Sequence, residues 1–528
     1  MTHMTQRGKL RSMIAAMTAT CLLLAMPTSQ AAGAGSSAVQ MRTVEGTTTA
    51  AAEQSAPLAA EQLDRAPAAE MNAAPVRASA PFAIVRAGKK WGALTPAGTL
   101  AIPAEYDEIV PYAEHLFAVR QGGKWGIAGA DGRMIVPVSY KSIDPMTADT
   151  IIVQDAKDRR GAYDAAGHLL LPVEFRAVSP FYDGVSCVEQ KKDRFVFFRR
   201  DGSRLSSETY AWARPFSEGL AVAAKSKKKA GYIDTTGTMV IPAKYEAAQD
   251  FSEGLAPVMH RGKWGFIDKA GAFVIKPKLR TDSISGFHEG LALVKEKKGW
   301  SFIDRSGKKV FHTRYEAVAP FEGGLAEVGR ETRTANIGGF LLKTLVIVKN
   351  LPTFGRDIEM FDEKMKRGYI DKTGAEVIST KHDYISDFED GMALVRRGGK
   401  WGMVDRTGSY IVAPEYSAIR RFSEGFAAVE QGELWGFVGR DGQIAIAPAY
   451  EEARDFHEGL AIVRQGQKSF FIDKTGRVPF LVPSTITALG DFASGLAPAK
   501  IGDKWGFIDH TGTIVIAPAY DEALTFFQ

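Results

Sequence analysis

A motif that returns every 34 to 36 residues is the feature that most constrains this chain. It reads K-W-G-F-I-D-x-x-G-x-x-V-I-x-P-x-Y, followed by F-S-E-G-L-A-x-V, and its clearest copies begin at Lys263, Lys400 and Lys504. A period of this length is typical of repeat proteins, in which each unit completes its core against its neighbours. Aligning the copies on the Gly of the Trp-Gly pair gives twelve units, at positions 92, 126, 161, 196, 231, 265, 301, 368, 402, 436, 470 and 506.

Each unit contains three apolar segments that we interpret as strands. The segments L-A-x-V and W-G-F-I-D are separated by a Gly-rich or Lys-rich turn such as Gly398-Gly399, and such residues suit tight hairpins. The sequence D-x-x-G, as in Asp268 to Gly271, fits a type I turn that is closed by a left-handed Gly. The third segment, V-I-x-P, is expected to end at its Pro, because Pro has no N–H for the ladder. The pattern predicts an all-β tandem array of about twelve three-stranded antiparallel meanders.

The Trp of the motif is expected to pack and not to react, because some units lack it. In five units Arg160, Phe195, Ala230, Arg367 and Ser469 take its place. The connectors between units carry a Tyr and a Phe in frame, which we expect to seal each unit on the next, since an aromatic side chain buries about 150–250 Å². The Trp of the repeat signature occurs at Trp91, Trp125, Trp264, Trp300, Trp401, Trp435 and Trp505.

These motifs resemble the WG-repeat family of bacterial proteins, which is named for the Trp-Gly pair. The resemblance covers roughly residues 82–528, and the full string K-W-G-F-I-D-x-x-G-x-x-V-I-x-P is specific. Membership implies a β-repeat array with an interaction role. It brings no catalytic residues, because the family is defined by its repeat and not by a shared reaction.

The sequence does not decide whether the units form an open array or a closed ring. Propeller blades usually have four strands and a period of about 40–50 residues, whereas this period is shorter and each unit shows three strands. No split unit is evident at the chain ends, so we expect an open or superhelical array, with a β-propeller-like ring as the alternative. An insertion at 331–366 separates seven units (81–330) from five (367–528), which also fits two sub-arrays. The insertion itself is interpreted as a flap that docks a partner or as a loop that packs across a gap.

The N-terminus predicts export. Arg7, Lys9 and Arg11 precede an apolar run over 13–26, and small residues follow up to Ala31, which is the pattern of a secretory signal peptide. We expect residues 1–31 to be removed, with no transmembrane segment left in the mature chain, because the run is shorter than the ~20 residues of a span. Residues 32–80 are rich in Ala and Pro and are expected to form a disordered linker. The expected location is periplasmic or extracellular.

Charge and cysteine content exclude several function classes. Loss of the three basic residues of the signal peptide lowers the Lys and Arg count from 66 to 63, against 61 acidic residues, so the net charge falls from +5 to about +2 (63 − 61). A chain so balanced does not predict binding to nucleic acid. Cys187 is the one cysteine left after cleavage, so no intrachain disulfide is expected.

We find no motif for catalysis, cofactor binding or metal binding, and expect none of these activities. The strongest candidate binding residues are lysines of the hairpin turns between the first two segments, which a repeat fold would align along one edge. They suit an acidic glycan or an acidic partner, or they are solvated residues that keep the edge soluble. These residues are Lys225, Lys227, Lys228 and Lys229 in one unit and Lys295, Lys297 and Lys298 in another.

The sequence therefore predicts an exported, non-enzymatic repeat scaffold that binds an envelope protein or peptide. One alternative is binding of cell-surface polysaccharide through the basic loop edge. The other is an enzyme built on a propeller-like ring, which a non-repeating polar cluster in one unit would favour.

Overall fold

The computed structural model describes residues 81–331 and 365–527, and these residues form strands and no helix. They fold into twelve antiparallel sheets, ten of four strands and two of three. The prediction of an all-β array of twelve units is confirmed. The predicted signal peptide, the linker and residues 332–364 of the insertion lie outside the described residues.

Each sheet is a blade, and we name its strands by position as inner, first long, second long and outer. The inner strands are β4 (Glu108–Ala113), β8 (Ser142–Ile143), β12 (Ala177–Val178), β15 (Trp212–Ser217), β19 (Ala247–Ala248), β23 (Ile284–His288), β27 (Ala317–Val318), β31 (Tyr384–Ile385), β35 (Ala418–Ile419), β39 (Glu452–Ala453), β42 (Ile486–Leu489) and β46 (Glu522–Ala523). The first long strands are β1 (Ala83–Ala87), β5 (Leu116–Gln121), β9 (Thr150–Gln154), β13 (Val185–Lys191), β16 (Leu220–Ser226), β20 (Ala256–His260), β24 (Leu291–Glu296), β28 (Leu325–Glu331), β32 (Met392–Arg397), β36 (Phe426–Gln431), β40 (Leu460–Gln465) and β43 (Ala497–Ile501).

The second long strands carry the Trp-Gly position. They are β2 (Lys90–Leu94), β6 (Lys124–Gly129), β10 (Arg160–Asp164), β14 (Arg194–Arg199), β17 (Lys229–Asp234), β21 (Lys263–Ile267), β25 (Gly299–Ile303), β29 (Met365–Asp371), β33 (Lys400–Asp405), β37 (Leu434–Gly439), β41 (Lys468–Asp473) and β44 (Lys504–Ile508). The outer strands, absent from the blades of β14 and β41, are β3 (Leu100–Tyr106), β7 (Met134–Tyr140), β11 (Leu169–Phe175), β18 (Met239–Tyr245), β22 (Phe273–Leu279), β26 (Lys309–Thr313), β30 (Glu376–His382), β34 (Tyr410–Tyr416), β38 (Ile444–Tyr450) and β45 (Ile514–Tyr520).

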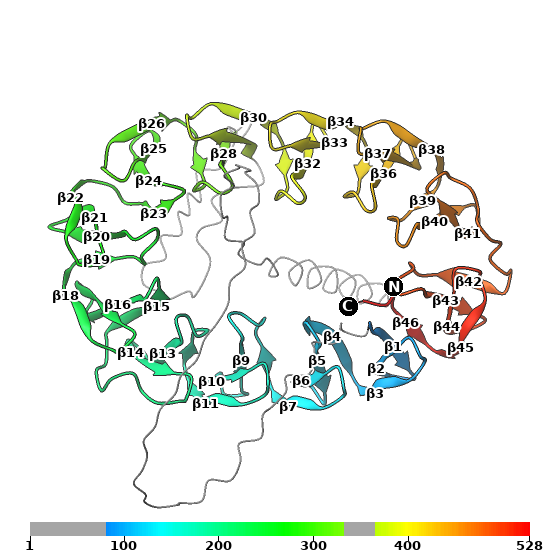
Figure 1. Cartoon of the computed structure of the whole chain (residues 1–528), viewed down its shortest axis with the longest axis horizontal. Coiled ribbons are helices and arrows are strands. Elements are labelled where there is room, and N and C mark those ends of the chain that lie inside the picture. The colour runs from blue at the N-terminus through cyan, green and yellow to red at the C-terminus, as the bar shows by residue number, and fades with distance from the viewer. Residues whose placement is uncertain (1–80, 332–364, 528) are drawn as a thin grey trace, which may run out of the picture. The chain divides into compact units, whose positions relative to one another are not determined.

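The last connector of the chain closes residues 81–527 into a ring. Strand β46 pairs with β1, with Arg86 opposite Glu522, and Phe82 N–H donates to the Phe527 carbonyl at 2.9 Å. Figure 1 shows the resulting ring of blades, in which β15 faces the central opening and β18 lies at the perimeter. The expected open array is therefore corrected to its alternative, a propeller-like ring. A split blade does exist, because the chain end supplies the inner strand for the blade of β1, β2 and β3.

The expected three-stranded units are four-stranded in ten blades, because the connector contributes the inner strand. Over all twelve blades, this strand is only two residues long in eight, as in β35 (Ala418–Ile419). So short a strand has no apolar alternation of its own, and the prediction missed it for this reason.

The Pro of V-I-x-P does not end the outer strand, contrary to expectation. Strand β45 continues past Pro518 to Tyr520, which pairs with Trp505, and two extra residues bulge between that pair and the next, Phe507 with Ile516. Pro is accepted here because β45 is an edge strand and because a bulge leaves the ladder unpaired at this point.

This bulge explains the Gly of the Trp-Gly pair. A Cβ added to Gly506 would lie 2.4 Å from the carbonyl oxygen of Ile516 in the bulged strand. All nine units that keep this Gly have the bulge, and the three that replace it lack the bulge. Val196 and Phe470 lie in the two blades without an outer strand, and Ser301 faces β26, which pairs with β25 without a bulge at that position.

The insertion lies inside one blade and does not divide two arrays. Strands β28 and β29 pair over seven residue pairs, from Leu325 with Asp371 to Glu331 with Met365. The insertion thus replaces the hairpin turn that joins the first and second long strands. The groups of seven and five units are parts of the same ring.

The hydrophobic core lies between neighbouring blades. Phe456 of one connector is fully buried and contacts Phe437 of the preceding blade, with ring centroids 4.8 Å apart. The same contact recurs between Phe266 and Phe287 at 4.8 Å. The expectation that connector aromatics seal adjacent units is confirmed.

The D-x-x-G turns adopt the expected geometry. The Gly closes the turn with positive φ, between 74° and 92° across the twelve units. In the turn at Asp268, the Oδ1 atom accepts hydrogen bonds from the N–H groups of Ala270 and Ala272, at 3.0 and 2.9 Å. The Asp carboxylates of this motif thus stabilise the turns by accepting backbone hydrogen bonds.

Candidate functional site

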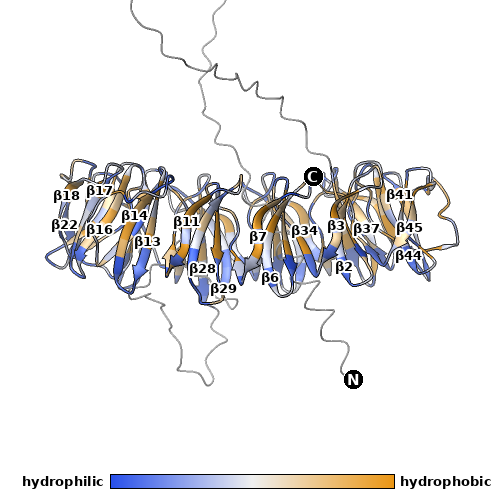
Figure 2. Cartoon of the chain, turned by 90° about the horizontal axis from the view of Figure 1, so that it is seen from below, coloured by the Kyte–Doolittle hydropathy of each residue, from blue (hydrophilic) through white to orange (hydrophobic). Residues whose placement is uncertain are grey.

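The ring presents two faces made of different turns. The hairpins between first and second long strands lie on one face, which we call the hairpin face. The D-x-x-G turns and the F-x-E-G connectors lie on the other, the connector face, because successive strands are antiparallel. Figure 2 shows hydrophilic residues along the lower edge, where β13 and β28 end and β6 begins.

Carboxylates on the connector face tie several blades to the next. The side chain of Glu289 accepts the N–H of Gly324 at 2.9 Å and pairs with Lys372 Nζ at 2.9 Å, both in the following blade. Burial alone would raise the pKa of Glu289, but the bonds from Lys372 and Gly324 outweigh it and the pKa is lowered. Glu424 repeats the arrangement with Gly459 and Lys474.

A second set of ion pairs ties the blades on the hairpin face. Lys90 Nζ lies 2.7 Å from Asp107 Oδ1, and Lys504 Nζ lies 2.7 Å from Asp521 Oδ1. In each pair the Lys precedes the Trp-Gly dipeptide and the Asp follows the Tyr of the outer strand. This explains why Lys belongs to the repeat signature.

The predicted lysines lie on the hairpin face, and the structure brings them onto one arc of it. Lys227 and Lys228 form the turn between β16 and β17, and Lys297 and Lys298 form the turn between β24 and β25. One blade separates these hairpins, and its turn contains Arg261. Equivalent loops do align along one edge, as the repeat predicted.

Two of the predicted lysines have partners within the protein. Lys225 lies 3.6 Å from Glu208, and Lys295 lies over the ring of Trp300 at 4.3 Å. Burial lowers the pKa of Lys295. Among the described residues, Lys227, Lys228, Lys229, Lys297 and Lys298 form no ion pair and all are exposed.

The signature Trp residues are structural. Trp264 and Trp300 are buried, and the other five are half-buried. Arg86 lies over Trp91 at 5.7 Å and Arg120 lies over Trp125 at 5.5 Å, each from the facing position of the first long strand. The Trp thus supports the basic residue that precedes the hairpin.

A non-repeating polar cluster, which sequence reasoning missed, occupies the blade that bears the insertion. Glu327 takes the third position of L-A-x-V, and Arg367 takes the Trp position. Their side chains are each 19% exposed and lie 3.5 Å apart. Burial raises the pKa of Glu327 to about 7, and the Asp387 carboxylate adds to the rise that Arg367 opposes. The signal in the sequence was two charged residues in apolar positions of one unit.

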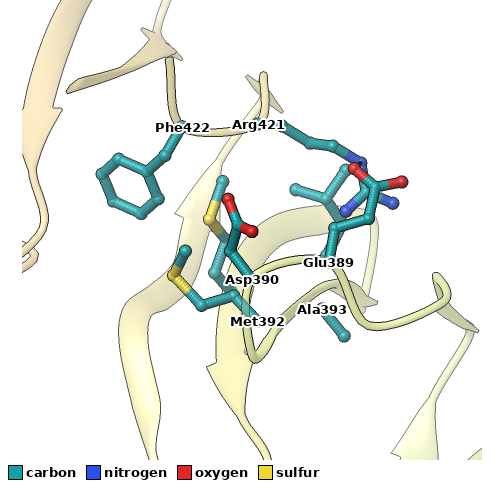
Figure 3. A pocket seen from close by; sticks show the side chains of 8 residues that line it. Glu389, Asp390, Met392, Ala393, Arg421 and Phe422 are labelled. Atoms are coloured by element: carbon teal, nitrogen blue, oxygen red, sulfur yellow. Dashed lines mark ion pairs between the residues drawn. The ribbon is translucent and has the colours of Figure 1, made fainter. Parts of the chain in front are cut away.

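The cavities of the connector face offer little to a ligand. Figure 3 shows one between neighbouring blades, with Glu389, Asp390 and Met392 on one side and Arg421 and Phe422 on the other. Its volume is about 30 Å³, which is the scale of a single water. A larger one, about 320 Å³, is bordered by Glu424, His457, Glu458, Phe492, Ala493, Ser494, Phe526 and Phe527. Its Glu424 carboxylate already accepts blade-to-blade bonds.

An apolar patch on the outer wall is a second surface that the sequence did not reveal. The blade of β41 lacks an outer strand, and residues 478–483 run there without pairing to β41. Phe480 packs on Phe471 with ring centroids 5.7 Å apart, while Leu481 is 87% exposed. With exposed residues of the flanking outer strands, the outer apolar patch comprises Ile444, Val478, Leu481, Ile514 and Val515. The signal was the sequence V-P-F-L-V-P in place of V-I-x-P.

Within residues 81–331 and 365–527, no group of three His, Cys, Asp or Glu side chains is placed to hold a metal ion. No helix in the same ranges has the length and hydropathy needed to cross a membrane.

Solved structures match this chain at low similarity. A eukaryotic initiation factor matches 76% of this chain and 100% of its own, at 10% identity and a TM-score of 0.35. BamB from Moraxella catarrhalis matches 55% and 90%, at 12% identity and a TM-score of 0.30. The tricorn protease matches 82% and 51%, at 12% identity and a TM-score of 0.25. The comparison with curated protein sequences gives no match.

The comparison with family models identifies the repeat. The model of the WG containing repeat matches nine segments, and the long stretch from 126 to 230 that it leaves unmatched includes the divergent units of Arg160 and Phe195. The matched segments are 91–125, 231–264, 264–300, 300–329, 368–401, 401–435, 435–468, 470–505 and 505–528. They span more than half of the chain, which therefore belongs to the family of proteins with the WG containing repeat.

Proposed function

We propose that this ring is an exported scaffold without catalytic activity that binds a protein or peptide partner in the cell envelope. The repeat architecture itself is that of a scaffold. The observation that carries the proposed partner class is the outer apolar patch, because Leu481 is 87% exposed and the outer strands of the two flanking blades also carry exposed aliphatic side chains.

The patch has the chemistry of a protein-binding surface. Leu481, Val478 and Val515 are 87%, 46% and 52% exposed, and exposed apolar surface at this part of the wall would suit a contact with another protein. Each fully buried aliphatic side chain contributes about 1.5–3 kcal/mol to association before the entropic costs. A partner that covers these residues would also cover the blade that lacks its outer strand.

The scaffold holds this surface in place. Phe480 holds residues 478–483 against the blade by packing on Phe471. A Cβ on Gly512 of the next blade would lie 3.0 Å from the Phe480 ring, so the two blades are in close contact here. Ion pairs between blades, such as Lys504 with Asp521, limit motion of neighbouring units. A surface that is ordered before binding loses less entropy when a partner docks.

Export and envelope location rest on the sequence alone. Arg7, Lys9 and Arg11 before the apolar run, and the small residues up to Ala31, support secretion. The envelope is accordingly the place in which a partner is sought.

Site-specific photo-crosslinking tests the proposal. A photoreactive residue at position 481 of residues 32–528 is expected to capture one protein from an envelope extract. With the photoreactive residue moved to Val478, capture should fail in the Leu481→Asp/Val515→Asp variant and persist in a matched control, Leu169→Asp/Val240→Asp. The control residues are 54% and 42% exposed on other outer strands.

Equal capture by both variants, or no specific product at position 481, would contradict the proposal. Thermal unfolding of both variants at the wild-type temperature would show that the ring is intact. A second photoreactive residue at Leu169 provides the background against which specific capture is judged.

A further inference from the structure

We infer that a basic arc on the hairpin face binds a linear anionic polysaccharide. The arc comprises the hairpin tips of four consecutive blades, those of β13 and β14, β16 and β17, β20 and β21, and β24 and β25. This site is separate from the outer apolar patch and does not depend on the function proposed for it. Its basic residues are Lys191, Lys192, Arg194, Lys225, Lys227, Lys228, Lys229, Arg261, Lys263, Lys297 and Lys298.

Five lysines of the arc form no ion pair among the described residues, although Asp193 lies in the first tip and the Glu246 carboxylate accepts the N–H of Gly262 at the third. Lys225 has a weak partner in Glu208 at 3.6 Å, with both side chains 54% exposed. Glu296, the acid nearest to the last tip, is already paired with Lys309 at 2.6 Å. Because like charges at the tips repel one another, a bound polyanion would relieve that repulsion.

The arc is local to one part of the hairpin face. Most other tips contain Gly, as in Gly122-Gly123, Gly398-Gly399 and Gly432-Glu433, and the tip between β9 and β10 mixes Lys157 and Arg159 with Asp155 and Asp158. Gly-Gly turns satisfy the backbone of a tight hairpin, so the lysines of the arc are not needed for turn formation. Replacement of glycines by lysines in neighbouring blades therefore points to a ligand.

The composition of the tips favours a glycan over a protein. None of the exposed large hydrophobic residues of the described chain lies in these tips. Protein interfaces are depleted in Lys and are anchored by aromatic residues or Arg, which these turns scarcely offer. Lys presents a hydrated point charge that suits a carboxylate without strict geometry. The spacing over four blades suits an extended chain that carries many such groups.

The test uses purified protein and polygalacturonate as the probe, with neutral dextran as the uncharged control. We expect binding of polygalacturonate at low ionic strength that weakens as salt shortens the Debye length below about 10 Å. The variant Lys227→Glu/Lys228→Glu/Lys297→Glu/Lys298→Glu should bind about tenfold more weakly or worse.

A matched variant separates the arc from net charge. Lys89→Glu/Lys124→Glu/Lys400→Glu/Lys468→Glu changes the same charge at exposed positions in hairpins outside the arc, and its affinity should remain within about twofold of wild type. The Leu481→Asp/Val515→Asp variant should bind polygalacturonate as wild type does, which keeps this outcome distinct from that of the proposed function.

Three results would overturn the inference. The first is no binding of polygalacturonate at low salt, and the second is equal loss in the arc and matched variants. The third is tighter binding of polyglutamate or of oligothymidylate, which would assign the arc to an acidic protein or a nucleic acid instead.

Discussion

Gly402 lies so close to the bulged outer strand that a Cβ at this position would be 2.4 Å from the carbonyl oxygen of Val412. The contact is to backbone and not to a side chain that could turn away. The Gly of the Trp-Gly pair is therefore required for steric reasons, because a side chain there would clash with the bulge that contains Pro414. The Trp supports the hairpin.

Gly402→Ala is expected to lower the free energy of unfolding by about 3 kcal/mol, because the outer strand must shift or lose its bulge. Gly399→Ala is the matched control, since its Cβ would meet nothing within 4 Å at φ 80°, and only the left-handed strain of about 1 kcal/mol is incurred. Urea unfolding measures both. Equal losses would refute the steric explanation of the motif.

Glu327→Gln is expected to flatten the dependence of stability on pH. The pKa of Glu327 is raised from 4.5 to about 7 in the folded protein. A raised carboxyl pKa leaves stability intact below 4.5 and reduces it as pH rises toward 7, by roughly 2–3 kcal/mol. The loss of stability between pH 4.5 and 8 should therefore be smaller in the variant.

Chemical denaturation at several pH values in that range measures the effect. Glu433→Gln, at an exposed hairpin tip, should keep the slope of the wild type. A Glu327→Gln variant that retains the full slope would show that this carboxyl group does not titrate in the expected window.

The carboxylates that bond to the following blade, such as Glu289, give the free energy of unfolding a pH dependence of opposite sign. The pKa of Glu289 is lowered from 4.5, so its contribution is present at neutral pH and is lost as pH falls below 4.5. Glu289→Gln should cost about 1 kcal/mol at pH 7, and the difference from wild type should shrink in acid. Differential scanning calorimetry at pH 7 and pH 3.5 measures this, with exposed Glu174→Gln as control. A loss of stability in Glu289→Gln that persists at pH 3.5 would indicate that the Glu289 side chain stabilises the seam by packing and not by its charge.

The sequence predicted those parts of the fold that repeat locally. Asp268 and Gly271 fix a turn within four residues, and a Phe recurs at the position of Phe456 in most connectors because it fills the seam between blades. Such features depend on contacts within about one unit, and a period of 34 to 36 residues displays them twelve times.

Closure and the binding surfaces could not be predicted in the same way. Closure depends on Arg86 lying opposite Glu522, far apart in the sequence, and on a small rotation per blade that no single unit encodes. Leu481 is exposed because the outer strand of its blade is missing, and the arc forms because neighbouring blades align their tips. Lys227 and Lys297, and their alignment along one edge, were predicted from the repeat, and the ring places that edge on one arc of the hairpin face.

The most direct test of the ring is a disulfide across its closure. Arg86 and Glu522 face each other on β1 and β46, and facing residues of an antiparallel pair have Cα atoms about 4.5–5.5 Å apart, within the range of a disulfide. In residues 32–528, Arg86→Cys/Glu522→Cys should oxidise to a monomeric, intramolecularly bridged species. The buried Cys187, whose pKa burial raises, should not compete. A product that remains reduced, or that links only separate molecules, would contradict the closed ring and restore the open array.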